Sequence, residues 1–449
     1  MKIRPNSFRL LSALLAGSLL AGPVLRAAPA VQQPVPDQLD LKTAVAFALE
    51  NNFSIRQARE RIKQQEGVVV QVSSRAIPNV AATGSYQRNS ADISQTFPPS
   101  DRSWAISLSA TQTLYAGGGV RSSIKSARLT REAAMLDLQS VINDALLTVR
   151  IDFYNVLLAR EKIKVQEENL ALLKQQLKNV TDRYDAGTVS AFEKLRADVA
   201  VANAQVPLIT ARNDYRLAIE QLRQALGFTT NTPENLRKIP DFVGSLDFSP
   251  ATFDLQAAFN AAHANRPDLR RLAKLQSAGE ESVTSARSGY YPKVSLVGGW
   301  ELFKGTTNAF GDSNDGLFIG LQSQWNIFDG RSTAGQVIQA RSQLEQSRLS
   351  LTDAQLAAEV EVRSDYSSFQ EATELADASQ KVVAEAEESV RLATARYDAG
   401  TATQLDVLQS QVDLTTARTN QLQAYYSYNV AVASLRKAMG QADDFVIAN

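Results

Sequence analysis

The residue types that most often do chemistry in proteins are scarce in this chain of 449 residues, which has no cysteine and a single histidine, His263. Without cysteine there is no disulfide, no thiolate metal site and no thiol nucleophile. One histidine cannot build a multi-histidine metal site, and His263 stands on a predicted helix with no second ligand nearby, so we expect it to be packed or solvated. No nucleophile and base are recognisable together. The sequence therefore predicts no enzyme, no cofactor and no metal site.

The charges are balanced, with 47 Lys and Arg residues against 47 Asp and Glu residues. Proteins that bind nucleic acid usually carry a basic excess or a clustered basic face, so we expect no nucleic-acid partner. Because the sequence shows neither a reactive group nor a charge excess, the secondary-structure elements and their arrangement are the main indication of function.

The first thirty residues have the composition of an export signal. Basic residues, among them Lys2 and Arg9, precede the largely apolar stretch 10–20, and Ala28–Ala30 offers small residues for cleavage. Pro23 stands where a lipoprotein signal needs cysteine, which excludes a lipid anchor. After residue 30 no apolar run approaches the ~20 residues of a membrane-spanning helix. We predict a signal peptide at 1–30 and, if the exported chain spans a membrane, strands as the spanning elements.

The sequence contains an internal duplication. Arg183–Thr188 recurs letter for letter as Arg396–Thr401, and further matches in the same register pair Pro78 with Pro292 and 222–227 with 435–440. All of these landmarks lie 213 or 214 positions apart. We therefore predict a first repeat at 31–227, an inter-repeat segment at 228–253, a second repeat at 254–440 and a C-terminal tail at 441–449.

Each repeat contains two stretches in which apolar and polar residues alternate, the signature of strands with one apolar and one polar face. The stretches run over 80–86 and 104–113, then over 294–302 and 317–327. At about ten residues each they match the strands of outer-membrane barrels, which span about 9–11 residues. Trp104, Trp300 and Trp325 fall on the apolar faces, and we expect them to anchor the strands against lipid.

Four strands cannot close a barrel, and an open sheet edge is not viable in lipid, so several chains must combine. Two chains would give eight strands, an interior that side chains fill, whereas three would give twelve and could leave a channel. The strand count therefore favours a homotrimer.

After each strand pair a glycine turn, Gly117–Gly119 or Gly330, leads into a helical stretch of about 64 residues without proline. At ~1.5 Å per residue such a helix is roughly 95 Å long. Its apolar residues follow heptad spacing, and so do those of the returning helix from Phe192 to Ile209, which predicts coiled-coil seams. The helices of each hairpin meet at the repeated Arg-Tyr-Asp-Ala-Gly-Thr turn.

These features resemble the TolC-like outer-membrane efflux proteins over essentially the whole mature chain. The most specific elements are the duplication, the Tyr397–Thr401 turn followed by Leu405–Leu408, and the stretch Asn265–Leu269. The resemblance implies a mainly α fold with β: a trimeric twelve-stranded transmembrane β-barrel, four strands per chain, continued by a long periplasmic coiled-coil helical barrel. It implies a location in the bacterial outer membrane, in contact with its lipid. It also implies work as the passive exit duct of a tripartite efflux or type I secretion system, with a periplasmic adaptor and an inner-membrane pump of the RND, ABC or a similar class.

The same resemblance assigns roles at the helical tips. It implies that Asp406, its counterpart Glu193 and Tyr397 line the periplasmic entrance. The residues expected to contact the adaptor are Ala186, Gly187, Thr188, Val189, Ala399, Gly400, Thr401 and Ala402. Two positions depart from the family pattern, because Ala402 replaces an arginine and Gln409 replaces a second acidic residue, so we expect an entrance with fewer restraints.

Two other functions stay open at this point. A stand-alone diffusion porin would need only short turns on the periplasmic side, which the long helices disfavour. An exported coiled-coil scaffold would not need strands with one apolar and one polar face.

Overall fold

The computed structural model describes residues 36–88, 90, 102–228, 239–304 and 310–441. The expected signal peptide, part of the inter-repeat segment and the tail beyond Gln441 lie outside these residues. The chain divides into two units, 1–38 with 229–241, and 39–228 with 242–449. In the described part of the first unit the amide of Asp241 donates to the carbonyl oxygen of Asp37 at 2.8 Å. The second unit holds the long helices and the four-stranded sheet.

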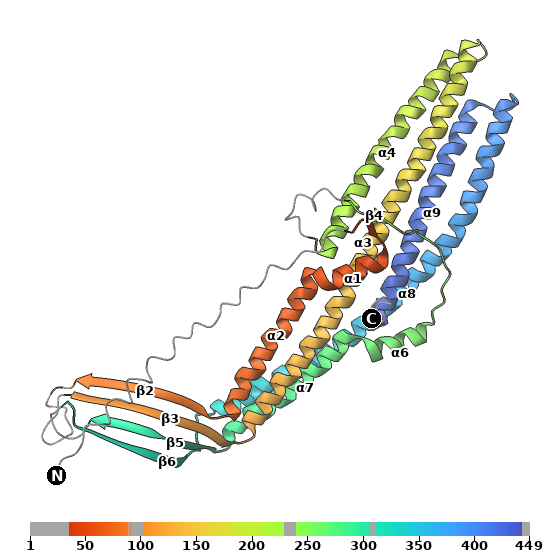
Figure 1. Cartoon of the computed structure of the whole chain (residues 1–449). Helices are drawn as coiled ribbons and strands as arrows, with labels where there is room; N and C mark the ends of the chain where they lie inside the picture. Colours follow the sequence, from red (N-terminus) through yellow and green to blue (C-terminus); the bar gives the residue numbers. More distant parts are fainter. Residues whose placement is uncertain (1–35, 89, 91–101, 229–238, 305–309, 442–449) are drawn as a thin grey trace. The chain divides into compact units, whose positions relative to one another are not determined.

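The same order of elements occurs twice (Figure 1). The first series is α1 (Leu41–Asn51), α2 (Phe53–Ser73), β2 (Asn79–Arg88), β3 (Arg102–Ala116), α3 (Gly119–Asp185) and α4 (Ala191–Leu226). The second is α6 (Leu255–Asn265), α7 (Pro267–Arg287), β5 (Lys293–Lys304), β6 (Ser313–Gln324), α8 (Ser332–Asp398) and α9 (Gln404–Ala438). The short elements are β1 (Gln38–Leu39), β4 (Asp241–Phe242) and the single-turn helices η1 (Ser74–Ala76) and η3 (Ser288–Tyr290). The described helices and strands give a mainly helical protein with some sheet.

The four longer strands form one antiparallel sheet in the order β2-β3-β5-β6. Its register pairs Tyr86 with Trp104, Leu108 with Trp300, and Trp300 with Leu317. Because directly paired residues point to the same side of a sheet, the apolar positions of all four alternating stretches share one face. That face is uncovered within the chain, and Leu317 is 86% exposed.

Two of the three tryptophans lie where the alternation placed them, and the third does not. Trp104 belongs to β3 and Trp300 to β5, but β6 ends at Gln324, so the expectation that Trp325 lies on a strand is wrong. Its indole Nε1 donates to the carbonyl oxygen of Tyr290 at 3.1 Å, which fixes the side chain beside the turn that precedes β5. The alternation of apolar and polar residues continues past Gln324, where the strand ends.

The long helices are as long as predicted, with 67 residues each in α3 and α8. Toward the hairpin tips α4, α3, α9 and α8 lie side by side in that order, as the contacts and Figure 1 show. Toward the sheet the order is α2, α3, α7, α8. None of the helices in the described residues has the length and hydrophobicity needed to cross a membrane.

The seam predicted on α4 is not the one that α4 buries within the chain. Phe192 is 65% exposed, and Leu195, Val199, Val206 and Ile209 are also exposed. The residues buried on this helix are mostly alanines, one position away or more: Ala197, Ala204, Leu208, Ala211, Ala218, Ile219, Leu222, Ala225 and Leu226. Small side chains let α3 and α4 approach closely, so within the chain α4 packs through its alanine-rich face and leaves the predicted seam exposed.

A glycine marks the junction where α4 ends beside the break between α1 and α2. Gly227 has φ +78°, and a Cβ there would lie 2.5 Å from the carbonyl oxygen of Asn51. The side-chain amide of Asn52 donates to the carbonyl oxygen of Ala225 at 2.7 Å, so the junction is closed by backbone contacts. Together α1, α2 and α4 therefore run along the length of α3.

We expect Gly227→Ala to lower the stability of the fold by at least about 2 kcal/mol, because it combines a left-handed backbone with a clash against backbone atoms. Gly187→Ala is the matched control, since Gly187 has φ +74° and nothing within 4 Å of a Cβ. It should cost only about 1 kcal/mol. Thermal unfolding followed by far-UV circular dichroism measures both, and equal losses would contradict the packed junction.

Candidate functional site: the hairpin tips and the charge network

The two long hairpins end in the same turn, and the shared hexapeptide explains its geometry. Gly187 has φ +74°, and both the amide and the hydroxyl of Thr188 donate to the carbonyl oxygen of Arg183 at 2.9 Å. The same two bonds join Thr401 to Arg396, at 2.8 and 3.1 Å. Glycine accepts the left-handed backbone and threonine satisfies a terminal carbonyl of the helix. The geometry of the turn therefore explains the glycine and the threonine without invoking contact with another protein.

The residues predicted to meet an adaptor lie at these turns and are accessible. Six are exposed and two are partly exposed: Ala186, Gly187, Thr188, Ala399, Gly400 and Thr401 in the first group, Val189 and Ala402 in the second. Both glycines have open space beyond their Cα atoms. Their contact with an adaptor stays a prediction.

One contact joins the two hairpins at their tips. The guanidinium of Arg183 donates to the carboxylate Oδ1 of Asp398 at 2.9 Å and lies 4.9 Å from the ring centre of Tyr397. Tyr397 is only 9% exposed, although it was expected to line the entrance. We call this contact the tip clasp. This arginine-carboxylate pair joins α3 to the end of α8.

Asp406 has a local structural role at the start of α9. Its carboxylate Oδ2 accepts from the amide and from the hydroxyl of Thr403, both at 2.8 Å, and its own amide donates to Thr403 Oγ1 at 3.3 Å. This reciprocal arrangement is a capping box. In α4 the counterpart is simpler, because the amide of Glu193 donates to Ser190 Oγ at 3.3 Å.

The hydrogen bonds from Thr403 hold the pKa of Asp406 below its ordinary value, and the charge of Arg396 contributes in the same direction. The pKa is lowered because the cap favours the ionised form of the carboxyl group. Asp406 therefore carries its charge at neutral pH.

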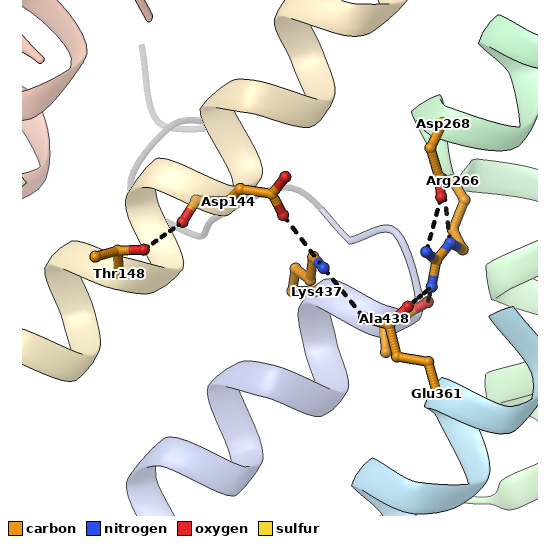
Figure 2. A network of polar contacts seen from close by, with 7 residues as sticks. All are labelled: Asp144, Thr148, Arg266, Asp268, Glu361, Lys437 and Ala438. Atoms are coloured by element: carbon orange, nitrogen blue, oxygen red, sulfur yellow. Dashed lines mark hydrogen bonds and ion pairs between the residues drawn. The ribbon is translucent and has the colours of Figure 1, made fainter. Parts of the chain in front are cut away.

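A second polar cluster lies far from the tips, where the ends of several helices meet (Figure 2). Arg266, whose side chain is 10% exposed, donates to both carboxylate oxygens of Asp268, at 3.1 and 2.8 Å, and to Glu361 at 2.5 Å. Lys437 continues the network, 3.1 Å from Glu361 and 3.2 Å from Asp144. The cluster links α7, α8, α9 and α3.

Burial alone would raise the pKa of Asp268 and of Glu361. The hydrogen bonds and the charge of Arg266, helped at Glu361 by Lys437, outweigh burial and leave both pKa values lowered. Burial would likewise lower the pKa of Lys437, but Glu361 and Asp144 raise it. Each charge is stabilised by an opposite one, so the network holds the helices together as ion pairs.

Arg266 lies in the stretch Asn265–Leu269 that carries the family resemblance, but its sequence neighbours predict no role for it. Its partner Glu361 lies 95 positions away along the chain, and Lys437, which pairs with Glu361, lies 171 positions away, so local spacing reveals only the nearby partner Asp268. His263, for its part, lies beside a carboxylate rather than alone, with Nε2 3.3 Å from Oε1 of Glu359.

The described residues define a class of protein with one antiparallel sheet, apolar and uncovered on one face, and two long helical hairpins. The model of the outer membrane efflux protein family matches residues 45–228 and 258–441, one segment in each repeat. Since these segments make up most of the chain, it belongs to that family. It is an outer-membrane protein that acts as an exit duct in efflux.

Curated relatives agree with this assignment. The outer membrane efflux protein BepC of Brucella suis is 24% identical over 446 residues, with 98% of this chain and 92% of that protein covered. The cobalt-zinc-cadmium resistance protein CzcC of Cupriavidus metallidurans is 25% identical, with 92% and 93% covered. The fold is also that of the solved VceC outer membrane protein of Vibrio cholerae, with a TM-score of 0.77 at 17% identity over 90% of this chain and 96% of that one.

We expect Arg266→Met to destabilise the protein by about 3–5 kcal/mol, because it leaves Asp268 and Glu361 without their main partner. Arg271→Met in α7, the helix that begins directly after Arg266, is the control, since Arg271 lies 3.6 Å from Asp137 in a more exposed pair and should contribute less than about 1 kcal/mol.

The effect should depend on pH. The pKa values of Asp268 and Glu361 are lower in the folded protein than in the unfolded chain, where they are about 4. The ion pairs therefore stabilise the fold above about pH 4, and this stabilisation is lost as the pH falls through the folded pKa values. The difference between wild type and Arg266→Met in thermal unfolding should therefore shrink on acidification. A constant difference would show that Arg266 acts through packing alone.

Proposed function

We propose that three copies of this chain form the outer-membrane exit duct of a tripartite efflux or type I secretion system. In this proposal the copies close a twelve-stranded barrel and a helical tunnel, which a periplasmic adaptor connects to an inner-membrane pump. The observation that carries the proposal is that, among the described residues, the sheet and the row of helices near the tips each end in two edges without a neighbour in the same layer. They are β2 and β6 in the sheet, and α4 and α8 in the row of helices near the tips.

The two faces of the sheet support a barrel in lipid. The exposed apolar face suits lipid, whereas the other face carries small and polar residues, for example Thr83 and Ser107, whose hydroxyls lie 2.7 Å apart. Three copies would supply twelve strands, and a barrel of that size leaves an aqueous interior. The two tryptophans on strands, Trp104 and Trp300, would then anchor the apolar face.

The helices distinguish this proposal from a diffusion porin. A porin has no use for 67-residue helices on the periplasmic side, whereas a duct that reaches a partner across the periplasm needs them. At ~1.5 Å per residue each helix is about 100 Å long. Relatives named for alkaline protease secretion and for pyoverdine export suggest that one scaffold serves unlike cargoes.

In the proposed trimer Asp406 and Glu193 would place six carboxylates near the periplasmic entrance, with Tyr397 behind them. We expect Asp406→Asn to weaken cation preference and divalent-cation block in planar bilayers, because it removes charge while keeping an acceptor for Thr403. Glu374→Gln on α8, remote from the tip, removes the same charge and should change neither property. Unchanged selectivity in Asp406→Asn would remove Asp406 from the entrance.

Docking at the tips can be tested in living cells with a photo-crosslinking residue. Placed at Ala402 or Val189, it should capture a periplasmic adaptor anchored in the inner membrane. Placed at the exposed Gln370, in the middle of α8, it should not. Equal capture at Gln370, or none at either tip, would contradict docking at the turns and favour the porin.

A further inference from the structure

We propose that Arg396 of one copy of this chain clasps the Tyr184–Asp185 pair of the next copy. The contact would repeat between chains what Arg183 makes with Tyr397–Asp398 within one chain. The inference rests on the proposed assembly of several copies and adds to it a specific interface contact.

The order of the helices leads to this pairing. Near the tips the row runs α4, α3, α9, α8, so the two repeats meet where α3 contacts α9 (Figure 1). Repetition makes α8 the counterpart of α3, and α4 the counterpart of α9. The free edges of the row are therefore copies of the two helices that meet in its middle. A second chain that brings its α4 against α8 restores the same relation, and a head-to-tail contact of this kind can close into a ring.

The residues of the tip clasp have identical counterparts in the other repeat. Within the chain Arg183 donates to Asp398 at 2.9 Å and covers the Tyr397 ring at 4.9 Å. The repeat supplies Arg396 on α8 and Tyr184–Asp185 at the end of α3, next to α4. All three residue types are the same, so the chemistry of the contact is complete once a second chain is present.

The second set of side chains lacks such a contact inside the chain. Among the described residues, neither Arg396 nor Asp185 has a side-chain ion pair. Tyr184 is 39% exposed, whereas its counterpart Tyr397 is 9% exposed. Lys194 lies 5.2 Å from the ring centre of Tyr184, and in the proposed contact Arg396 would approach the other ring face.

A second ion pair between α3 and α9 is not present in both repeats. Arg418 of α9 and Glu168 of α3 form a pair at 2.7 Å. Their repeat counterparts are Gln205 and Lys381, which cannot form one. The repeated clasp is therefore specific to the tips, where it would tie each hairpin to the next around the entrance.

The absence of cysteine allows a direct test by crosslinking. An arginine-aspartate pair spans more than a disulfide permits, so the reagent is a short bis-maleimide. In membranes, Arg396→Cys combined with Asp185→Cys should shift most chains to covalent dimers and trimers, whereas either single variant should stay monomeric. Arg183→Cys with Asp398→Cys should crosslink within one chain and keep the monomer mass. Glu374→Cys with Asp185→Cys, about 33 Å away along α8 from Arg396, should give no multimers.

The outcomes separate the clasp from the assembly. If an amine-reactive crosslinker yields trimers while the Arg396→Cys and Asp185→Cys pair stays monomeric, the clasp is wrong and the trimer stands. If neither reagent yields multimers, the proposed assembly fails as well.

A charge exchange gives an independent readout. Arg396→Asp and Asp185→Arg should each lower the temperature at which the assembly dissociates in detergent, and the double variant should recover most of the loss. Both residues are on the surface, so the monomer should still fold. Additive losses in the double variant would overturn the proposed pairing.

Discussion

The contact between the two repeats of one chain is the constraint on which the rest of the structure depends. In the sheet it joins β3 to β5, and in the helices it joins α3 first to α7 and then to α9. Each repeat contributes one of its two edges to this contact, and its other edge stays uncovered within the described part of the chain. Among the described residues, the sheet and the row of helices near the tips each therefore end in two different edges, an arrangement that suits assembly by rotation.

A long helix such as α3 has little core of its own, so its position depends on its neighbours. The apolar cluster around Phe153 holds α1, α3 and α4 together, and the ion-pair network of Arg266 and Lys437 ties α3 to the second repeat. Buried ion pairs contribute modestly to stability but strongly disfavour arrangements that separate the charges. The network thus helps to fix the register in which the repeats meet, and through it the placement of the tips.

The tips show how one short sequence can serve two purposes. Glycine and threonine of the hexapeptide build the turn, while arginine, tyrosine and aspartate act between hairpins. Asp406 likewise caps a helix and carries a charge at the end of the hairpin. Such double use explains why the structural and functional interpretations of these residues could not be separated by sequence alone.

The sequence by itself determined the duplication, the four alternating strands and the length of the helices, because periodicity and composition are local properties of the chain. It also carried the family resemblance. The face that α4 buries, the end of β6 before Trp325 and the burial of Tyr397 were decided only in the tertiary structure. The pairing of Arg266 with Glu361 and that of Arg183 with Asp398 were decided there too, since each joins distant parts of the chain. Spacing marks which residues are apolar or charged, but close packing between particular helices selects which of them meet.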